Sequence, residues 1–194
     1  MIRKMNGRGL ECAAILAALA GMATGAQAQV FDWANPVPGS WHSAFSWNPQ
    51  LVPSGPGATG SMTVPGTYTV TMGGSVTVGG VVLGHSGVTL SRTSTGFLTL
   101  SSMVNNGLVS VGDGGPGEAS VRASSTNVPI VGTGTLRLNA LANDGTCFLN
   151  ERPEGGGTFE QGAGHTLAGA GEVYCPFHNN GTIDADVPGL AIVM

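Results

Sequence analysis

Apolar and polar residues alternate in short runs along most of the chain after residue 66. In "YTVTM" from Tyr68, "TLRLN" from Thr135 and "TIDA" from Thr182, every second residue is apolar. Because the side chains of a strand point alternately to its two faces, each run predicts a strand with one buried face. Glycines separate the runs, and no stretch has the roughly 3.6-residue period of an amphipathic helix, so the pattern predicts an all-β protein.

Three segments repeat the order strand, turn, strand: residues 94–111, 132–149 and 169–185. Their early glycines are 38 and 37 residues apart, and their middle glycines are 38 and 36 apart (Gly96, Gly134, Gly171; Gly107, Gly145, Gly181). We interpret the segments as copies of a repeat of about 37 residues. Aligned in this way, the copies place Leu98, Leu136 and Val173 inward, and Thr99, Arg137 and Tyr174 outward.

Each middle glycine ends an Asn-Asn-Gly or Asn-Asp-Gly triplet. Asn and Gly tolerate positive φ, so Gly107, Gly145 and Gly181 are predicted to be structural turns, with positive φ or another conformation that a Cβ resists. One copy is too small to bury its own apolar face, but stacked copies bury a continuous core. Residues 66–194 are therefore predicted to form a parallel β-helix (a β-solenoid). A β-sandwich or Greek-key barrel is the alternative.

The two ends of the chain differ from the repeats. Residues 1–28 have a basic start, an apolar run and the small-residue stretch "AQA", which together indicate a signal peptide and export to the periplasm, cell surface or extracellular space. Residues 29–65 hold all three tryptophans and more than half of the prolines, so we expect them to cap one end. Nothing after the third copy resembles a second cap. We therefore expect a truncated solenoid, or self-association through the C-terminal coil.

The charge of the chain restricts the classes of molecule that it is expected to bind. After residue 28 the chain has no Lys, four Arg and ten acidic residues, for a formal net charge of −6. Such a chain has no basic patch that could bind phosphates, so nucleic acid is not an expected partner. Polysaccharide or cell-surface components are the expected partners. The sequence predicts no transmembrane segment after cleavage of the signal peptide.

Few residues suggest catalysis. Asp184 and Asp186 are predicted to lie on one face of a strand. Paired carboxylates can act as acid and base on a glycosidic bond, so these two residues are the weak catalytic candidates. The alternative interpretation is that both carboxylates lie on a strand face that contacts only solvent. The pair resembles that of polygalacturonases, but a mature chain without Lys cannot carry the Arg-x-Lys motif of that family.

Other candidate motifs point to structure. The two matches to G-x-G-x-x-G, residues 55–60 and 112–117, are interpreted as loops because no helix follows them. The four histidines lack the short spacing of a zinc site, so we expect no metal and no cofactor. Cys147 and Cys175 occupy inward positions, either as small buried hydrophobic residues or as a disulfide.

The stretch "WANPVPGSWHSAFSWNPQLVP", followed by Gly-rich strands and repeated "NNG" corners, resembles exported bacterial β-solenoid repeat proteins. These include autotransporter-passenger-like proteins and surface proteins of the PEP-CTERM type. The resemblance implies an exported, non-catalytic solenoid that acts as a surface, structural or adhesive scaffold. The alternative is a polysaccharide-active β-helix enzyme or a carbohydrate-binding module.

Overall fold

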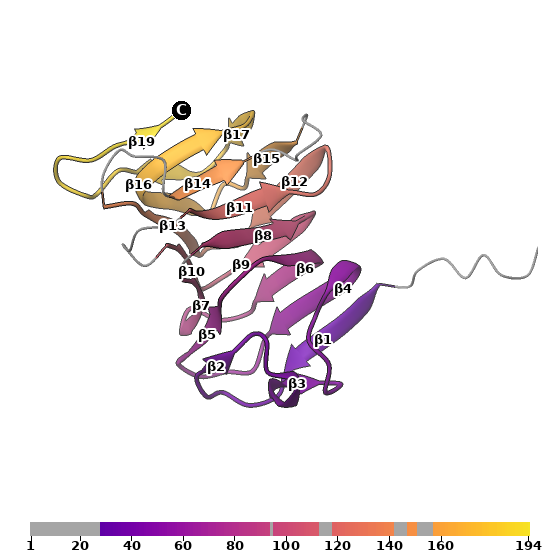
Figure 1. Cartoon of the computed structure of the whole chain (residues 1–194). Helices are drawn as coiled ribbons and strands as arrows, with labels where there is room; N and C mark the ends of the chain where they lie inside the picture. Colours follow the sequence, from indigo (N-terminus) through magenta and orange to yellow (C-terminus); the bar gives the residue numbers. More distant parts are fainter. Residues whose placement is uncertain (1–27, 94, 113–117, 142–146, 151–156) are drawn as a thin grey trace, which may run out of the picture.

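The chain forms a parallel β-helix whose coils stack from the N-terminal to the C-terminal end (Figure 1). The computed structural model describes residues 28–93, 95–112, 118–141, 147–150 and 157–194. Within these ranges all strand pairs are parallel except the pair of β1 with β3. Parallel pairing across long connections excludes the sandwich and the Greek-key barrel, which are built from antiparallel strands. No helix in the described residues is long and apolar enough to cross a membrane.

The strands lie on three sheets, which we name A, B and C. Sheet A contains β1 (Gln29–Trp33), β3 (Trp47–Asn48), β4 (Gly55–Met62), the second half of β6 (Val76–Leu83), β9 (Ser102–Asn105), β12 (Asn127–Val131), β15 (Thr158–Gln161) and β17 (Phe177–Asn179). Sheet B contains β2 (Gly39–Ser40), β5 (Tyr68–Met72), β7 (Val88–Arg92), β10 (Leu108–Val111), β13 (Thr135–Asn139), the first half of β16 (Thr166–Tyr174) and β18 (Thr182–Asp184). Sheet C contains the start of β6, β8 (Gly96–Leu100), β11 (Ala119–Ala123), β14 (Cys147–Asn150), the end of β16, and β19 (Ile192–Val193). A short 3₁₀ helix, η1 (Ala44–Ser46), precedes β3.

Inward side chains stack into rows that fill the interior of the coils. One row on sheet B and one on sheet C consist only of residues at most 7% exposed: Val70, Leu90, Val109, Leu136 and Leu167; Val76, Leu98, Val121, Leu149 and Val173. The predicted inward residues are thus buried, and the predicted outward residues Thr99, Arg137 and Tyr174 are half-buried or exposed. The alternation predicted from the sequence is confirmed.

The repeat of about 37 residues is not the coil of the β-helix. Leu98 and Val173 share an inward row on sheet C, but Leu136 of the second copy lies on sheet B. From Leu98 to Val173 the chain completes three coils, through Val121 and Leu149. Two intervals of the apparent repeat therefore equal three coils of unequal length. The first strands of the first and third copies therefore lie on sheet C, whereas the first strand of the second copy lies on sheet B.

The N-terminal segment covers one end of the interior with three tryptophans. Trp33, Trp41 and Trp47 are each at most 1% exposed. The Trp47 ring packs edge to face with the other two, and its centre lies 4.9 Å from that of Trp33 and 4.8 Å from that of Trp41. Each indole N–H donates to a backbone carbonyl.

Residues 55–60, interpreted above as a loop, form part of β4, so that interpretation was wrong. β4 already pairs in parallel with β6, and a Cβ at Gly60 would overlap the Trp41 ring.

The last coil is more exposed than the others. β18 pairs with β16 on one side and with no further strand in the described chain. Ile183, an expected inward residue, is consequently 37% exposed, although it continues the row of Leu167. Self-association through this coil stays a prediction, as does the signal peptide, because residues 1–27 lie outside the described residues.

The first and third Asn-x-Gly triplets, residues 105–107 and 179–181, form corners from sheet A to sheet B, and the second lies outside the described residues. Asn105 Oδ1 accepts a hydrogen bond from the Gly107 N–H (3.0 Å), and Asn179 Oδ1 accepts one from the Gly181 N–H (2.9 Å). These side-chain-to-backbone turns confirm the corners. Gly107 and Gly181 do not have positive φ, and Gly145 lies outside the described residues. The two described glycines nevertheless occupy positions that resist a Cβ, which would overlap a backbone carbonyl oxygen at each. Glycine is needed for space instead, because a Cβ at Gly107 would overlap the Val88 carbonyl oxygen of the preceding coil.

We expect Gly107→Ala to lower the free energy of unfolding by about 1–3 kcal/mol, because neighbouring backbone must move to admit the methyl group. Gly73→Ala is the matched control, since a Cβ there would meet no heavy atom within 4 Å, and it should change stability by less than about 0.5 kcal/mol. Urea unfolding followed by tryptophan fluorescence measures both. Equal stability of the two variants would show that the corner tolerates a side chain.

Candidate binding face on sheet C

The outward side of sheet C brings together polar and aromatic residues from four coils. The parallel register places Thr99 beside Arg122, Arg122 beside Asn150, and Asn150 beside Tyr174. Successive members are one strand apart, about 4.8 Å. A second outward row runs beside this one. We call the following residues the sheet C face: Phe97, Glu118, Ser120, Arg122, Asn150, Glu172 and Tyr174.

Arg122 packs on Phe97 within this face. Its guanidinium carbon lies 3.2 Å from the centre of the Phe97 ring, a cation–π arrangement. Burial lowers the pKa of Arg122, and the negative charge of Glu118 acts in the opposite direction. An arginine stays protonated under these conditions, so the face has a fixed positive charge on an aromatic ring.

Three polar atoms of the face are buried and have no hydrogen-bond partner in the described part of the chain. They are Ser120 Oγ, Arg122 Nε and Glu172 Oε2. Ser120 is 0% exposed, although its register places it in the outward row beside Phe97. Buried polar atoms in native proteins nearly always have a partner, and leaving one unsatisfied costs about 1–3 kcal/mol. These three atoms lie beneath the surface of the described face, so a ligand can reach them only if neighbouring side chains move.

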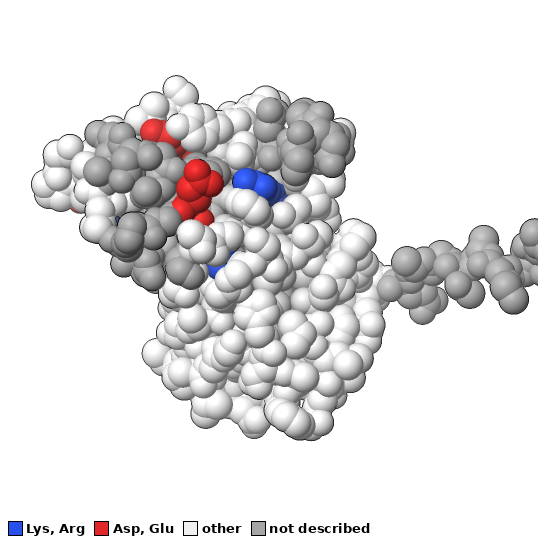
Figure 2. Space-filling model, viewed as in Figure 1, with Lys and Arg blue, Asp and Glu red and all other residues white. Residues whose placement is uncertain are grey.

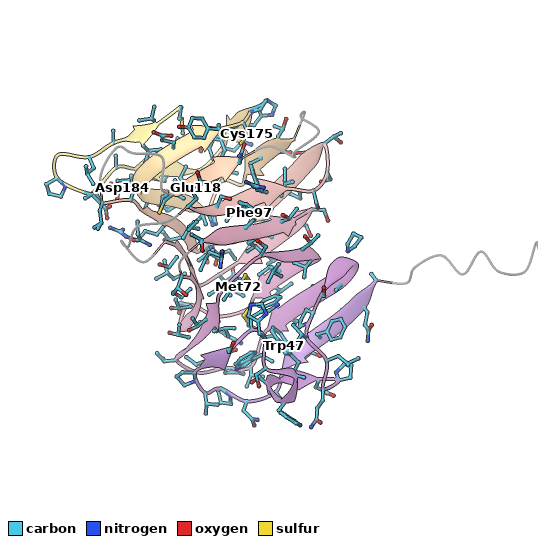
Figure 3. All side chains as sticks on the ribbon, viewed as in Figure 1. Trp47, Met72, Phe97, Glu118, Cys175 and Asp184 are labelled. Carbon is cyan, nitrogen blue, oxygen red and sulfur yellow. The ribbon has the colours of Figure 1, made fainter. Side chains whose placement is uncertain are left out.

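A hollow of about 370 Å³ opens at one end of the face. It is lined by Ser75, Thr95, Gly96, Phe97 and Glu118. Figure 3 shows Phe97 and Glu118 close together on the near side of the molecule, while Asp184 lies at its edge. In Figure 2 the charged residues of this view gather over the half nearer the C-terminal end, and the half built from the first coils shows none.

The two aspartates predicted as weak catalytic candidates lie away from this face, on the outer side of sheet B. Arg137 donates two hydrogen bonds to Asp186, at 2.8 and 3.0 Å. This contact is the main reason that the pKa of Asp186 lies below its usual range. A general acid needs a raised pKa, so Asp186 is poorly suited to protonate a leaving group. Asp184 is exposed, in register with Ala168 and Arg137.

The histidines and cysteines do not form a site. His42 and His85 are exposed and contact backbone carbonyls, and the described residues contain no cluster of three or more potential metal ligands. Cys147 is buried, as expected for a small hydrophobic residue, and Cys175 packs against the core. The register pairs Leu149 with Val173, which places the two cysteines at opposite ends of the β14–β16 ladder. That separation is about 13 Å along the strand, too far for a disulfide between them.

A buried polar cluster occupies the corner between sheets A and B. Asn105 Nδ2 donates to Nε2 of His165 at 3.0 Å, and Gln161 Nε2 donates to the carbonyl oxygens of His165 and Thr182 at 2.6 and 2.9 Å. His165 is 1% exposed. Burial lowers its pKa from 6.5 to about 4. Asn105 Nδ2 also donates to the Thr135 carbonyl oxygen, so the side chains of the cluster join four successive coils.

No protein-family model, curated protein or solved structure matches this chain. The parallel β-helix expected from the resemblance to exported solenoid proteins is present, and membership of that group stays a prediction.

The alternation along the strands predicts that Tyr174 and Arg137 point outward, but it does not reveal the sheet C face. Phe97 and Arg122 are far apart in sequence and fall in strands of different coils. An available signal was the aromatic Phe97 directly before the inward Leu98, at a position where a solvated strand usually has a polar residue.

Proposed function

We propose that this chain is an exported, non-catalytic β-helix that serves as a surface, structural or adhesive scaffold. The observation that carries the proposal is the stacking of outward hydroxyl side chains in register along sheet B. This row contains one apolar interruption, Leu108, and five threonines: Thr69, Thr89, Thr135, Thr166 and Thr182. A long, regular row of hydroxyl groups suits contact with extended partners better than it suits chemistry at one point.

The alternative of a polysaccharide-active enzyme requires a carboxylic acid and a carboxylate positioned on a glycosidic bond. Asp186 is held in an ion pair with Arg137, which opposes the acid role. Binding of polysaccharide without turnover needs no such pair and is compatible with a scaffold.

The test has two arms. In the first, residues 29–194 are incubated with neutral and acidic polysaccharides, and reducing ends and unsaturated products are measured. We expect no turnover above background, with the same result for Asp184→Asn. In the second arm, the full chain is expressed in a bacterial host; mass spectrometry should find the mature protein beginning at Gln29, outside the cytoplasm. Turnover abolished by Asp184→Asn, or retention of an uncleaved chain in the cytoplasm, would contradict the proposal.

A further inference from the structure

We infer that the sheet C face binds a neutral polysaccharide chain that lies along the axis of the β-helix. Binding at this face needs no catalysis and does not depend on the scaffold role. It rests on the aromatic rings, the hydrogen-bonding groups and the charge of the face.

Two aromatic rings mark the two ends of the face. Phe97 lies on β8 and lines the hollow, with one face of its ring covered by Arg122, and Tyr174 lies on β16 with 55% of its surface exposed. Three strand-to-strand steps separate β8 from β16, through β11 and β14, or about 14 Å. The C–H face of a sugar ring packs on an aromatic side chain, which offers a flat apolar surface with little conformational freedom to lose. The two rings are spaced for different sugars of one extended chain.

The polar side chains between the rings suit a partner that both donates and accepts. Arg122 offers only donors and Glu172 only acceptors, and both residues are partly exposed, although Arg122 Nε and Glu172 Oε2 themselves are buried. A hydroxyl group can pair with either side chain, because it carries one donor and two acceptor sites. An anion would satisfy only Arg122, and a cation would satisfy only Glu172. Asn150 adds an amide with both functions beside Arg122.

The charge of the face decides between neutral and acidic polysaccharides. Arg122 is opposed by two carboxylates, Glu118 and Glu172, and the chain after residue 28 has a formal net charge of −6. A polyanion such as a uronic-acid polymer would approach an excess of negative charge without a compensating basic patch. The ligand class that fits is therefore a polymer of uncharged sugars.

Affinity gel electrophoresis of residues 29–194 tests this inference with hydroxyethylcellulose, xylan and galactomannan as neutral probes, and with polygalacturonate and alginate as acidic probes. We expect at least one neutral polymer to retard the protein. Phe97→Ala and Tyr174→Ala should each weaken that binding about tenfold or more, because each removes an aromatic anchor. Phe45→Ala is the matched control, because it removes an aromatic ring that is 80% exposed on η1, outside the face. Tyr174→Phe should bind within about twofold of the native chain, because the ring remains.

A second measurement needs no variant. Titration of the ¹⁵N-labelled native chain with cellohexaose and xylohexaose should shift backbone amide resonances of β11, β14 and β16 more than those of sheets A and B. Retardation only by polygalacturonate or alginate would overturn the assignment of a neutral ligand. Absence of retardation by every neutral probe, binding that is lost in Phe45→Ala but kept in Tyr174→Ala, or resonance shifts confined to other sheets would overturn the site itself. None of these outcomes requires catalysis, so they are distinguishable from failure of the scaffold proposal.

Discussion

Trp47→Ala is expected to lower the free energy of unfolding by about 3–5 kcal/mol. Trp47 is 1% exposed, and its ring contacts both Trp33 and Trp41, so truncation leaves a cavity at the centre of the N-terminal cluster. It also removes the donor to the Trp41 carbonyl oxygen, a hydrogen bond of 2.7 Å. β3, which carries Trp47, pairs with β1, so the loss should loosen the coil that covers this end of the interior.

Phe45→Ala provides the control for this variant. Phe45 is two residues away but 80% exposed, and its removal should change stability by less than about 0.5 kcal/mol. Trp47→Phe should fall between the two, because a ring remains while the N–H donor is lost. Chemical denaturation followed by circular dichroism compares all three. If Trp47→Ala were as mild as Phe45→Ala, the tryptophan cluster would not stabilise the end of the β-helix.

A second large effect is expected from acid. The pKa of His165 is about 4 in the folded chain, below its ordinary value of 6.5, because burial disfavours the charged ring. The unfolded chain therefore takes up this proton more readily, and stability is lost as the pH falls from 6.5 towards 4. One unit of pKa corresponds to about 1.4 kcal/mol, so the loss from this residue is roughly 3 kcal/mol. Above pH 6.5 the contribution is fully present.

The geometry of the corner explains why protonation is unfavourable. Asn105 Oδ1 accepts from the Gly107 N–H and its Nδ2 donates to the Thr135 carbonyl oxygen, so the orientation of the amide is fixed. Nδ2 therefore faces His165 Nε2 as a donor, and this nitrogen can accept only while it is unprotonated. A proton at Nε2 would replace a hydrogen bond with two opposed donors.

Comparison of the native chain with His165→Gln isolates this contribution from that of the carboxylates. Glutamine can present an acceptor oxygen towards Asn105 but does not titrate. The difference in free energy of unfolding between pH 7 and pH 4, measured in urea, should be smaller in the variant by roughly 3 kcal/mol. The same pH dependence in both proteins would show that His165 is not buried in its neutral form.

The candidate site depended on contacts that only folding creates. Each row of the sheet C face takes one residue from each coil, and the members are joined by strand pairing rather than by spacing along the chain. Connections between strands differ in length, so stacked residues on sheet B are between 16 apart (Thr166 with Thr182) and 31 apart (Thr135 with Thr166). Without a fixed period, no sequence pattern could place Arg122 on Phe97.

What the sequence alone determined was local. Alternation marked the buried and outward residues of strands such as β8 and β13, because neighbouring side chains of a strand must face opposite sides. Two Asn-x-Gly triplets marked corners of the described chain, because an asparagine side chain can bond to the backbone two residues later. Tryptophans concentrated before the strands indicated a buried cluster at one end.

Only the tertiary structure decided which strands stack. A strand with alternating apolar residues looks the same on any of the three sheets, since each sheet turns one face to the interior. Leu136 therefore matched Leu98 in sequence, although the first lies on sheet B and the second on sheet C. The role of Gly107 was likewise set by its neighbour: the Val88 carbonyl oxygen of the preceding coil occupies the space that a side chain would need.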